Sequence, residues 1–86
     1  MIVNYSKSFI KQFKKSPQKI KSQLIKRLEL FSKNPSHLSL HNHSLNGEYL
    51  GYRSINVSGD WRAIYVQMSE NAVLFIALGT HSQLYK

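Results

Sequence analysis

Residues 49–78 read YLGYRSINVSGDWRAIYVQMSENAVLFIAL, and this stretch decides the fold. Its first nine residues alternate with a period of two, which predicts a β-strand with two different faces. A turn at residues 58–59 then leads into a second strand, residues 61–68, antiparallel to the first. The continuous apolar run of residues 72–78 predicts a third strand, covered by helices on one face and flanked by a partner strand on each edge.

Two helices are expected before these strands. Ser6 can cap a first helix, in which two phenylalanines stand four residues apart. Ser16 and Pro17 are expected to begin a second helix, with serine at the cap and proline at the first helical position, where a missing N–H costs nothing. This helix is expected to end at Asn34-Pro35, and its apolar residues repeat at helical spacing: Ile20, Leu24, Leu28 and Phe31.

The remaining segments complete a predicted β-α-α-β-β-β order. Residues 2–5 form a short apolar run that predicts a first strand, and residues 36–47 show neither period and are expected to be a loop. We therefore expect an α+β fold with two layers, in which two N-terminal helices pack on one face of a four-stranded antiparallel sheet. A chain of 86 residues is sufficient for one domain, residues 1–86, with one modest core.

The composition limits the classes of partner. Twelve Lys and Arg residues against four acidic residues give a net charge of +8, which favours RNA, DNA, an acidic membrane surface or an acidic protein. The chain has no cysteine, which excludes disulfides and thiolate zinc sites. The N-terminal apolar run is too short for a signal peptide, and no apolar run approaches the ~20 residues of a membrane span. These features predict a cytoplasmic protein without membrane contact.

Four histidines are the natural candidates for acid and base chemistry, because histidine changes its charge near neutrality. His37 and His41 are expected to be inert surface residues. His41 and His43 have the spacing of metal ligands, but no third ligand follows at a suitable distance, so neither a metal nor another cofactor is expected. His81 directly follows the apolar strand in Gly79-Thr80-His81-Ser82, and its position at the exit of the strand favours a functional role.

Other polar residues near the predicted strands extend this set. Asp60 is either a turn residue that bonds to its own backbone or a carboxylate that orients an imidazole. Arg53 and Arg62 are either solvated strand residues or phosphate ligands. If Val57 pairs with Asp60 across a two-residue turn, Arg53, Asp60 and Arg62 share one face of the sheet. Tyr85 lies outside any apolar period and could stack on a base.

These groups suit the cleavage of RNA without a metal. In that reaction the 2′-hydroxyl of the substrate attacks the adjacent phosphate, a base removes its proton, and an acid protonates the leaving 5′-oxygen. Cations stabilise the negative charge that develops on the phosphate. DNA lacks the attacking hydroxyl, so the chemistry favours RNA as the substrate.

Four short motifs together resemble a known family. They are His43-x-Leu45-x-Gly47, Gly51-Tyr52-Arg53, Asp60-Trp61 with Ile64-Tyr65, and Gly79-Thr80-His81-Ser82-x-Leu84-Tyr85. In this order and spacing, and over the whole chain, they resemble the YafQ-like branch of the RelE/ParE superfamily of type II toxins. The resemblance implies a ribosome-dependent mRNA endonuclease, which needs no metal and is silenced by a cognate antitoxin. The antitoxin is expected to be acidic and to lie over the helices or a sheet edge.

The resemblance also assigns roles to individual residues. His43, Asp60, His81 and Tyr85 occupy the positions of the catalytic set. RNA or phosphate binding is expected for Arg53, partly from its motif, and for Arg62 from its chemistry alone. The same binding is expected for Asn56, Lys14 and Lys15. Two positions depart from the family, because Asn56 stands where relatives have a further histidine and Ser54 where they have an aspartate. Asparagine cannot transfer a proton near neutral pH, so cleavage could be slower or absent.

Two other functions remain open at this stage. A ParE-like toxin without catalytic activity would inhibit a protein target such as DNA gyrase. A plain basic RNA-binding domain would also carry the observed charge. The glycine and histidine motifs favour the nuclease over both.

Overall fold

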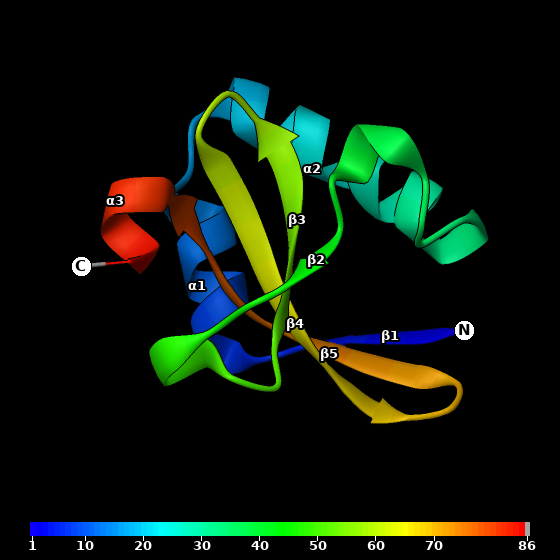
Figure 1. The fold of residues 1–86 in the computed structure, drawn as a ribbon. Helices are drawn as coiled ribbons and strands as arrows, with labels where there is room; N and C mark the ends of the chain where they lie inside the picture. The colour runs from blue at the N-terminus through cyan, green and yellow to red at the C-terminus, as the bar shows by residue number, and fades with distance from the viewer. Residues whose placement is uncertain (86) are drawn as a thin grey trace.

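The computed structural model describes residues 1–85 and has one sheet of five strands, in the order β1-β5-β4-β3-β2 (Figure 1). Two helices follow the first strand and lie on one side of this sheet, and a short third helix follows the last strand. The mixed α+β class is therefore confirmed. The strands are β1 (Ile2–Tyr5), β2 (His43–Ser44), β3 (Arg53–Ser58), β4 (Trp61–Ser69) and β5 (Ala72–Thr80), and the helices are α1 (Lys7–Lys15), α2 (Gln18–Lys33) and α3 (His81–Leu84).

The predicted sheet of four antiparallel strands is wrong in two respects. A fifth strand, β2, lies beside β3, with His43 opposite Ser54. In addition, β1 pairs with β5 in parallel, with Ile2 opposite Ala72. No hairpin joins β1 to β5, because almost the whole chain lies between them, so no turn imposes an antiparallel direction. As predicted, β5 has a partner on each edge, since β4 pairs on its other side.

The segment predicted as a loop, residues 36–47, contains short elements. A 3₁₀-helix spans Leu38–Leu40, and β2 follows it. A second 3₁₀-helix, Gly47–Tyr49, occupies the residues where the alternating strand was expected to begin, so β3 starts only at Arg53. These elements have two or three residues each, which is too short to show a period in the sequence.

The hairpin between β3 and β4 differs by one residue from the predicted one. Ser58 pairs with Trp61 across a turn at residues 59–60, so the predicted pairing of Val57 with Asp60 is wrong. The register shifts between Asn56 and Ser58, which is the signature of a β-bulge. The glycine of the turn has φ 55°, in the left-handed region that favours glycine.

This bulge separates the two strand arginines. Asn56 lies opposite Arg62, whereas Arg53 lies opposite Tyr65. Side chains alternate along a strand, and partners across an antiparallel pair share a face. Arg53 therefore shares the helix-covered face with Tyr65, and Arg62 shares the other face with Asn56. The prediction that Arg53, Asp60 and Arg62 share one face is wrong.

Both ends of α1 are fixed by serine side chains. The Ser6 hydroxyl accepts from the N–H of Phe9 at 3.0 Å and caps α1 as predicted. Ser16 was expected to begin α2, but it ends α1, because its hydroxyl donates to the carbonyl of Phe13 at 2.6 Å. Pro17 takes the cap position of α2 instead. No helix within residues 1–85 is both long and apolar enough to cross a membrane.

Apolar side chains pack on both faces of the sheet. The larger core lies under α1 and α2, where Phe31 and Tyr65 meet edge to face at 4.9 Å between ring centres. On the other face Leu45, Ile64 and Ala77 form a smaller cluster, extended by tyrosines of the segment after β2 and by the side chains of α3. The face that the two-layer prediction leaves free is thus partly covered.

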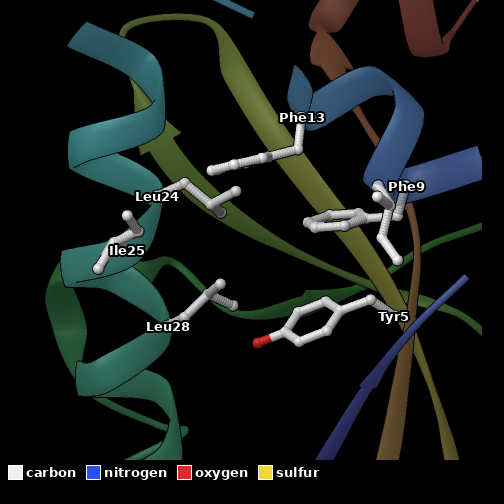
Figure 2. Close-up of a pocket in the computed structure, with 7 residues that line it drawn as sticks. Tyr5, Phe9, Phe13, Leu24, Ile25 and Leu28 are labelled. Carbon is white, nitrogen blue, oxygen red and sulfur yellow. The ribbon is translucent and has the colours of Figure 1, made fainter. Parts of the chain in front are cut away.

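A purely apolar hollow of about 220 Å³ opens between the two long helices and β1. Figure 2 shows the side chains of Phe13, Leu24 and Leu28 pointing into the space between α1 and α2, with the ring of Tyr5 level with Leu28 and its hydroxyl pointing towards that leucine. Burial raises the pKa of the Tyr5 hydroxyl above its usual value. This hollow contains no imidazole or guanidinium group, so it is separate from the residues that could carry acid–base chemistry.

Candidate active site

Two hollows share the side chains of His43, Arg62 and His81. The larger one has a volume of about 450 Å³, and the smaller one about 290 Å³. We call the two together the histidine hollow. The fold thus brings together two histidines that lie far apart in the sequence, with one of the two strand arginines. Its remaining lining residues are His41, Asn42, Ser44, Leu45, Asn46, Asn56 and Tyr85.

The ring of His43 is held by a hydrogen bond to the backbone. Strand β2 places this residue beside Ser54 of β3, and its Nδ1 atom lies 2.7 Å from the carbonyl oxygen of His41. A carbonyl oxygen can only accept, so Nδ1 must carry the proton of this bond. The Nε2 atom of the neutral ring is then unprotonated and can accept a proton. This hydrogen bond therefore leaves Nε2 as the ring atom of His43 that can accept a proton.

His81 is held at the first position of α3. Its backbone N–H donates to the carbonyl of Asp60 at 2.8 Å, which ties the start of the helix to the β3–β4 turn. Its ring packs against Tyr85 at 4.7 Å between centres, and Tyr85 packs in turn against Tyr49 at 5.7 Å. Tyr85 is thus half-buried and forms part of the wall of the histidine hollow.

A capping box begins α3. The Thr80 hydroxyl accepts from the N–H of Gln83 at 3.3 Å, and the Gln83 side-chain oxygen accepts from the N–H of Thr80 at 2.8 Å. The residue before the cap is Gly79, where a Cβ atom would lie 3.0 Å from that same Gln83 oxygen. Glycine therefore leaves the space that the cap needs. The motif Gly79-Thr80-His81 is explained by this turn of helix, which the sequence analysis did not predict.

Arg62 provides a cation on the same face. Its Nη1 atom donates to the carbonyls of Gly59 and Trp61 at 2.8 and 3.0 Å. Within residues 1–85, neither Nε nor Nη2 of Arg62 has a hydrogen-bond partner. The side chain of Asn56, its partner across the strands, lines the same hollow. Contacts to phosphate were expected for both residues from the sequence.

The other candidate residues lie elsewhere. Arg53 faces the helix side, where its Nε donates to the Asn42 side chain at 2.8 Å, and it does not line the histidine hollow. Asp60 is an exposed turn residue that contributes its backbone carbonyl, and its carboxylate does not line the hollow either. Lys14 and Lys15 lie in the last turn of α1, and Lys15 lines a different hollow with Trp61.

Two residues of the site were missed or set aside by sequence reasoning. His41, which was expected to be inert, lines the histidine hollow and has a left-handed backbone with φ 46°. The spacing of His41 and His43 was the available signal, because two histidines only two residues apart lie close together whatever the backbone conformation. Asn42 lies between them and was not considered. His37 lies outside the hollow, where its Nδ1 accepts from the N–H of Ser39 at 3.1 Å.

The hollow is rich in nitrogen groups and is lined by no carboxylate. Among residues 1–85, no group of three or more histidine, aspartate or glutamate side chains lies close enough to hold a metal ion. The groups that are present can accept or donate protons and can bind an anion. This arrangement is suited to general acid–base chemistry on a phosphate group.

The model of a YafQ family, described as the bacterial toxin of a type II toxin–antitoxin system, matches residues 1–86. The chain belongs to the YafQ family of bacterial toxins. The crystal structure of YafQ from E. coli strain BL21(DE3) is 26% identical, covers 98% of this chain and 97% of its own, and superposes with a TM-score of 0.83. YafQ in the E. coli DinJ–YafQ complex is also 26% identical, with a TM-score of 0.67 and coverage of 98% and 97%.

The fold extends to more distant toxins. A YoeB/ParE toxin from Agrobacterium tumefaciens is 15% identical, covers 94% of this chain and 99% of its own, and has a TM-score of 0.77. Likeness at this identity concerns the fold alone. A comparison with curated protein sequences finds no significant match. The predicted resemblance to the YafQ-like branch is confirmed by the family match over the whole chain.

Proposed function

We propose that this YafQ-family toxin is an endoribonuclease that cleaves mRNA on the ribosome without a metal ion. The observation that supports the proposal most directly is the histidine hollow, where two imidazoles and a guanidinium group meet on one face of the sheet. The substrate phosphate would lie between these groups. The product ends would be a 2′,3′-cyclic phosphate and a 5′-hydroxyl, because the 2′-oxygen forms the new bond to phosphorus as the bond to the 5′-oxygen breaks.

The hydrogen bond of His43 supports a division of roles between the two histidines. With Nδ1–H bonded to the carbonyl of His41, the free Nε2 can take the proton of the attacking 2′-hydroxyl. His81 is then the acid that gives a proton to the leaving 5′-oxygen. Each proton transfer of this kind contributes about 10²–10⁴ in rate.

Arg62 would stabilise the charge that develops on the phosphate oxygens, since Nε and Nη2 remain available for bonds to an anion. Asn56, which the resemblance implies to be a replacement of a histidine, can donate a hydrogen bond but cannot transfer a proton. His41 supplies a third imidazole to the same hollow. The substitution at position 56 therefore leaves the hollow with three imidazole rings.

An antitoxin is the proposed partner that controls this activity. E. coli YafQ forms a complex with DinJ, and at 26% identity over almost the whole chain the same kind of partnership is proposed here. The strong positive charge predicts an acidic partner. The ribosome and its mRNA are the other proposed partners.

The direct test combines the purified toxin with translating ribosomes and maps the 5′ ends of the mRNA. We expect cuts in phase with codons for the wild type. His43→Ala and His81→Ala should each lower the cleavage rate by about 10²–10⁴, because each removes one proton transfer. Ribosome binding, measured by co-sedimentation, should remain, since neither change removes a fixed charge.

A matched control is His37→Asn. It removes an imidazole from the same part of the chain but outside the histidine hollow, and asparagine can still accept from the N–H of Ser39. This variant should cleave at the wild-type rate. Growth arrest without codon-phased cuts would overturn the nuclease proposal and favour inhibition of a protein target. If either alanine variant cleaves at the wild-type rate, the histidine that it lacks has no role in the mechanism.

A further inference from the structure

The segment that carries His41 and His43 is anchored by the residue between them. The Asn42 amide group uses both of its N–H donors and its oxygen within the protein. Its Nδ2 donates to the carbonyl of Pro35 at 3.0 Å and to the hydroxyl of Tyr65 at 2.8 Å, and its Oδ1 accepts from Nε of Arg53 at 2.8 Å. The three bonds define one orientation of the amide, because a flip would place its oxygen against the carbonyl of Pro35 and its nitrogen against the N–H of Arg53.

The groups that hold Asn42 come from rigid parts of the fold. Tyr65 belongs to β4 and is 3% exposed, with its ring 4.9 Å from Phe31 and 5.2 Å from Phe75 between centres. Arg53 is the first residue of β3, and Pro35 follows the end of α2. Asn42 thus ties the histidine-bearing segment to a helix end and to two neighbouring strands.

The consequence for His43 follows through the backbone. His41 precedes Asn42 and has a left-handed backbone, with φ 46°. Its carbonyl oxygen accepts a hydrogen bond from Nδ1 of His43. Asn42 lies between this carbonyl and the ring that bonds to it. Fixing the Asn42 side chain therefore fixes both ends of the bond that selects the tautomer of His43.

We propose that Asn42, clamped by Arg53 and Tyr65, is a positioning residue that holds His43 in its Nδ1-protonated tautomer. The clamp also gives Arg53 a role in place of the phosphate contact expected from the sequence. Its consequence for cleavage rests on the proposed nuclease function, but its effect on the imidazole does not.

The decisive measurement is the tautomer of His43, read from the ¹⁵N chemical shifts of its ring by NMR in the full-length protein. In the wild type we expect the Nδ1-protonated form. In Asn42→Ala the three side-chain bonds are removed, and the ring should change to a mixture with the Nε2-protonated form. Tyr65→Phe keeps the aromatic core but removes one of the three bonds. In this variant the ¹⁵N shifts of the His43 ring should lie between those of the wild type and those of Asn42→Ala.

The control is Asn71→Ala, which changes the same residue type in the turn between β4 and β5, away from the histidine hollow. It should leave the ring of His43 unchanged. An unchanged Nδ1-protonated ring in folded Asn42→Ala and in Tyr65→Phe would overturn the proposal, whether or not the toxin cleaves RNA.

Cleavage kinetics provide a second readout that a loss of stability alone would not produce. Misplacing the base should lower kcat of Asn42→Ala by about 10² while KM stays near the wild-type value, because Arg62 and the rest of the surface still bind RNA. A rise in KM with unchanged kcat would contradict a positioning role. If the wild type does not cleave at all, the nuclease proposal fails, while the tautomer measurement still decides the role of Asn42.

Discussion

Ser54, which lies opposite His43, shows how a single residue next to the site can lower stability. Its side chain is fully buried next to β2, and its hydroxyl is the one buried side-chain group within residues 1–85 that has no hydrogen-bond partner. A buried polar group without a partner pays its desolvation without a compensating bond. This is the position at which relatives were expected to have an aspartate.

Replacing this hydroxyl tests that cost. Ser54→Ala should leave the free energy of unfolding within about 0.5 kcal/mol of the wild type or raise it, because no bond is removed. Ser16→Ala is the matched change, since the Ser16 hydroxyl is also buried but donates to Phe13, and it should lower stability by about 1 kcal/mol. Urea unfolding followed by tryptophan fluorescence measures both. Equal losses of stability for the two variants would show that Ser54 has a partner.

At the residue scale, the sequence motifs selected two histidines that the fold brings together, but they did not show which of the two arginines lies near them. His43 and His81 were identified from motifs, and the fold brings them together. Arg53 and Arg62 could not be told apart, because a one-residue bulge at Val57 decides which face each occupies. No feature of the sequence marks that bulge before the partner strand is known.

At the scale of a single element, the short helix α3 fixes the position of His81. It has four residues, so its own hydrogen bonds cannot maintain it, and the capping box at Thr80 supplies the missing partners. The helix carries His81 and packs Tyr85 against Tyr49. The position of one histidine therefore depends on a cap.

Thr80→Ala should destabilise this turn by about 1 kcal/mol, because the N–H of Gln83 loses its acceptor. We expect faster amide hydrogen exchange at Gln83, a weaker nuclear Overhauser effect between the rings of His81 and Tyr85, and slower cleavage. Thr80→Ser keeps the hydroxyl and should restore all three. Cleavage that stays at the wild-type rate while the exchange at Gln83 accelerates would show that His81 does not need the cap.

Long helices and strands were easier to predict from the sequence than the shortest elements. The long helix α2 and the strands β4 and β5 contain enough residues to show an apolar period or a continuous apolar run, and all three were predicted near their observed bounds. The two residues of β2 and the single turn of α3 show neither. The parallel pairing of β1 with β5 was missed for another reason, because it joins segments from opposite ends of the chain.

At the scale of the molecule, charge and chemistry are separated. Helices α1 and α2 carry nine of the twelve basic residues and one of the four acidic residues, so their net charge equals the +8 of the whole chain. The histidine hollow lies on the opposite face of the sheet, with Arg62 as its fixed cation. The helical layer is therefore the surface expected to attract a polyanion, while the opposite sheet face carries the groups proposed to act on the phosphate.

The separation predicts that binding and cleavage respond to different substitutions. The double variant Lys14→Gln, Lys15→Gln should weaken ribosome binding and reduce the slope of log K against log salt by roughly two, because two phosphates are no longer neutralised. The rate of cleavage at saturating ribosomes should stay unchanged. Binding is measured by co-sedimentation between low and physiological salt. Glu70→Gln serves as the control, and a salt slope unaltered in the double lysine variant would contradict the assignment.

The parallel pairing of β1 with β5 also governs when the protein can complete its fold during its own synthesis. β1 is the first of the five strands to be made, but its partner β5 is made after the other four. His81 follows that partner directly, so the sheet is not closed and the hollow lacks His81 until β5 and the residue after it have been made. We therefore expect that a nascent chain which ends before β5 lacks the histidine hollow and, with it, the proposed activity.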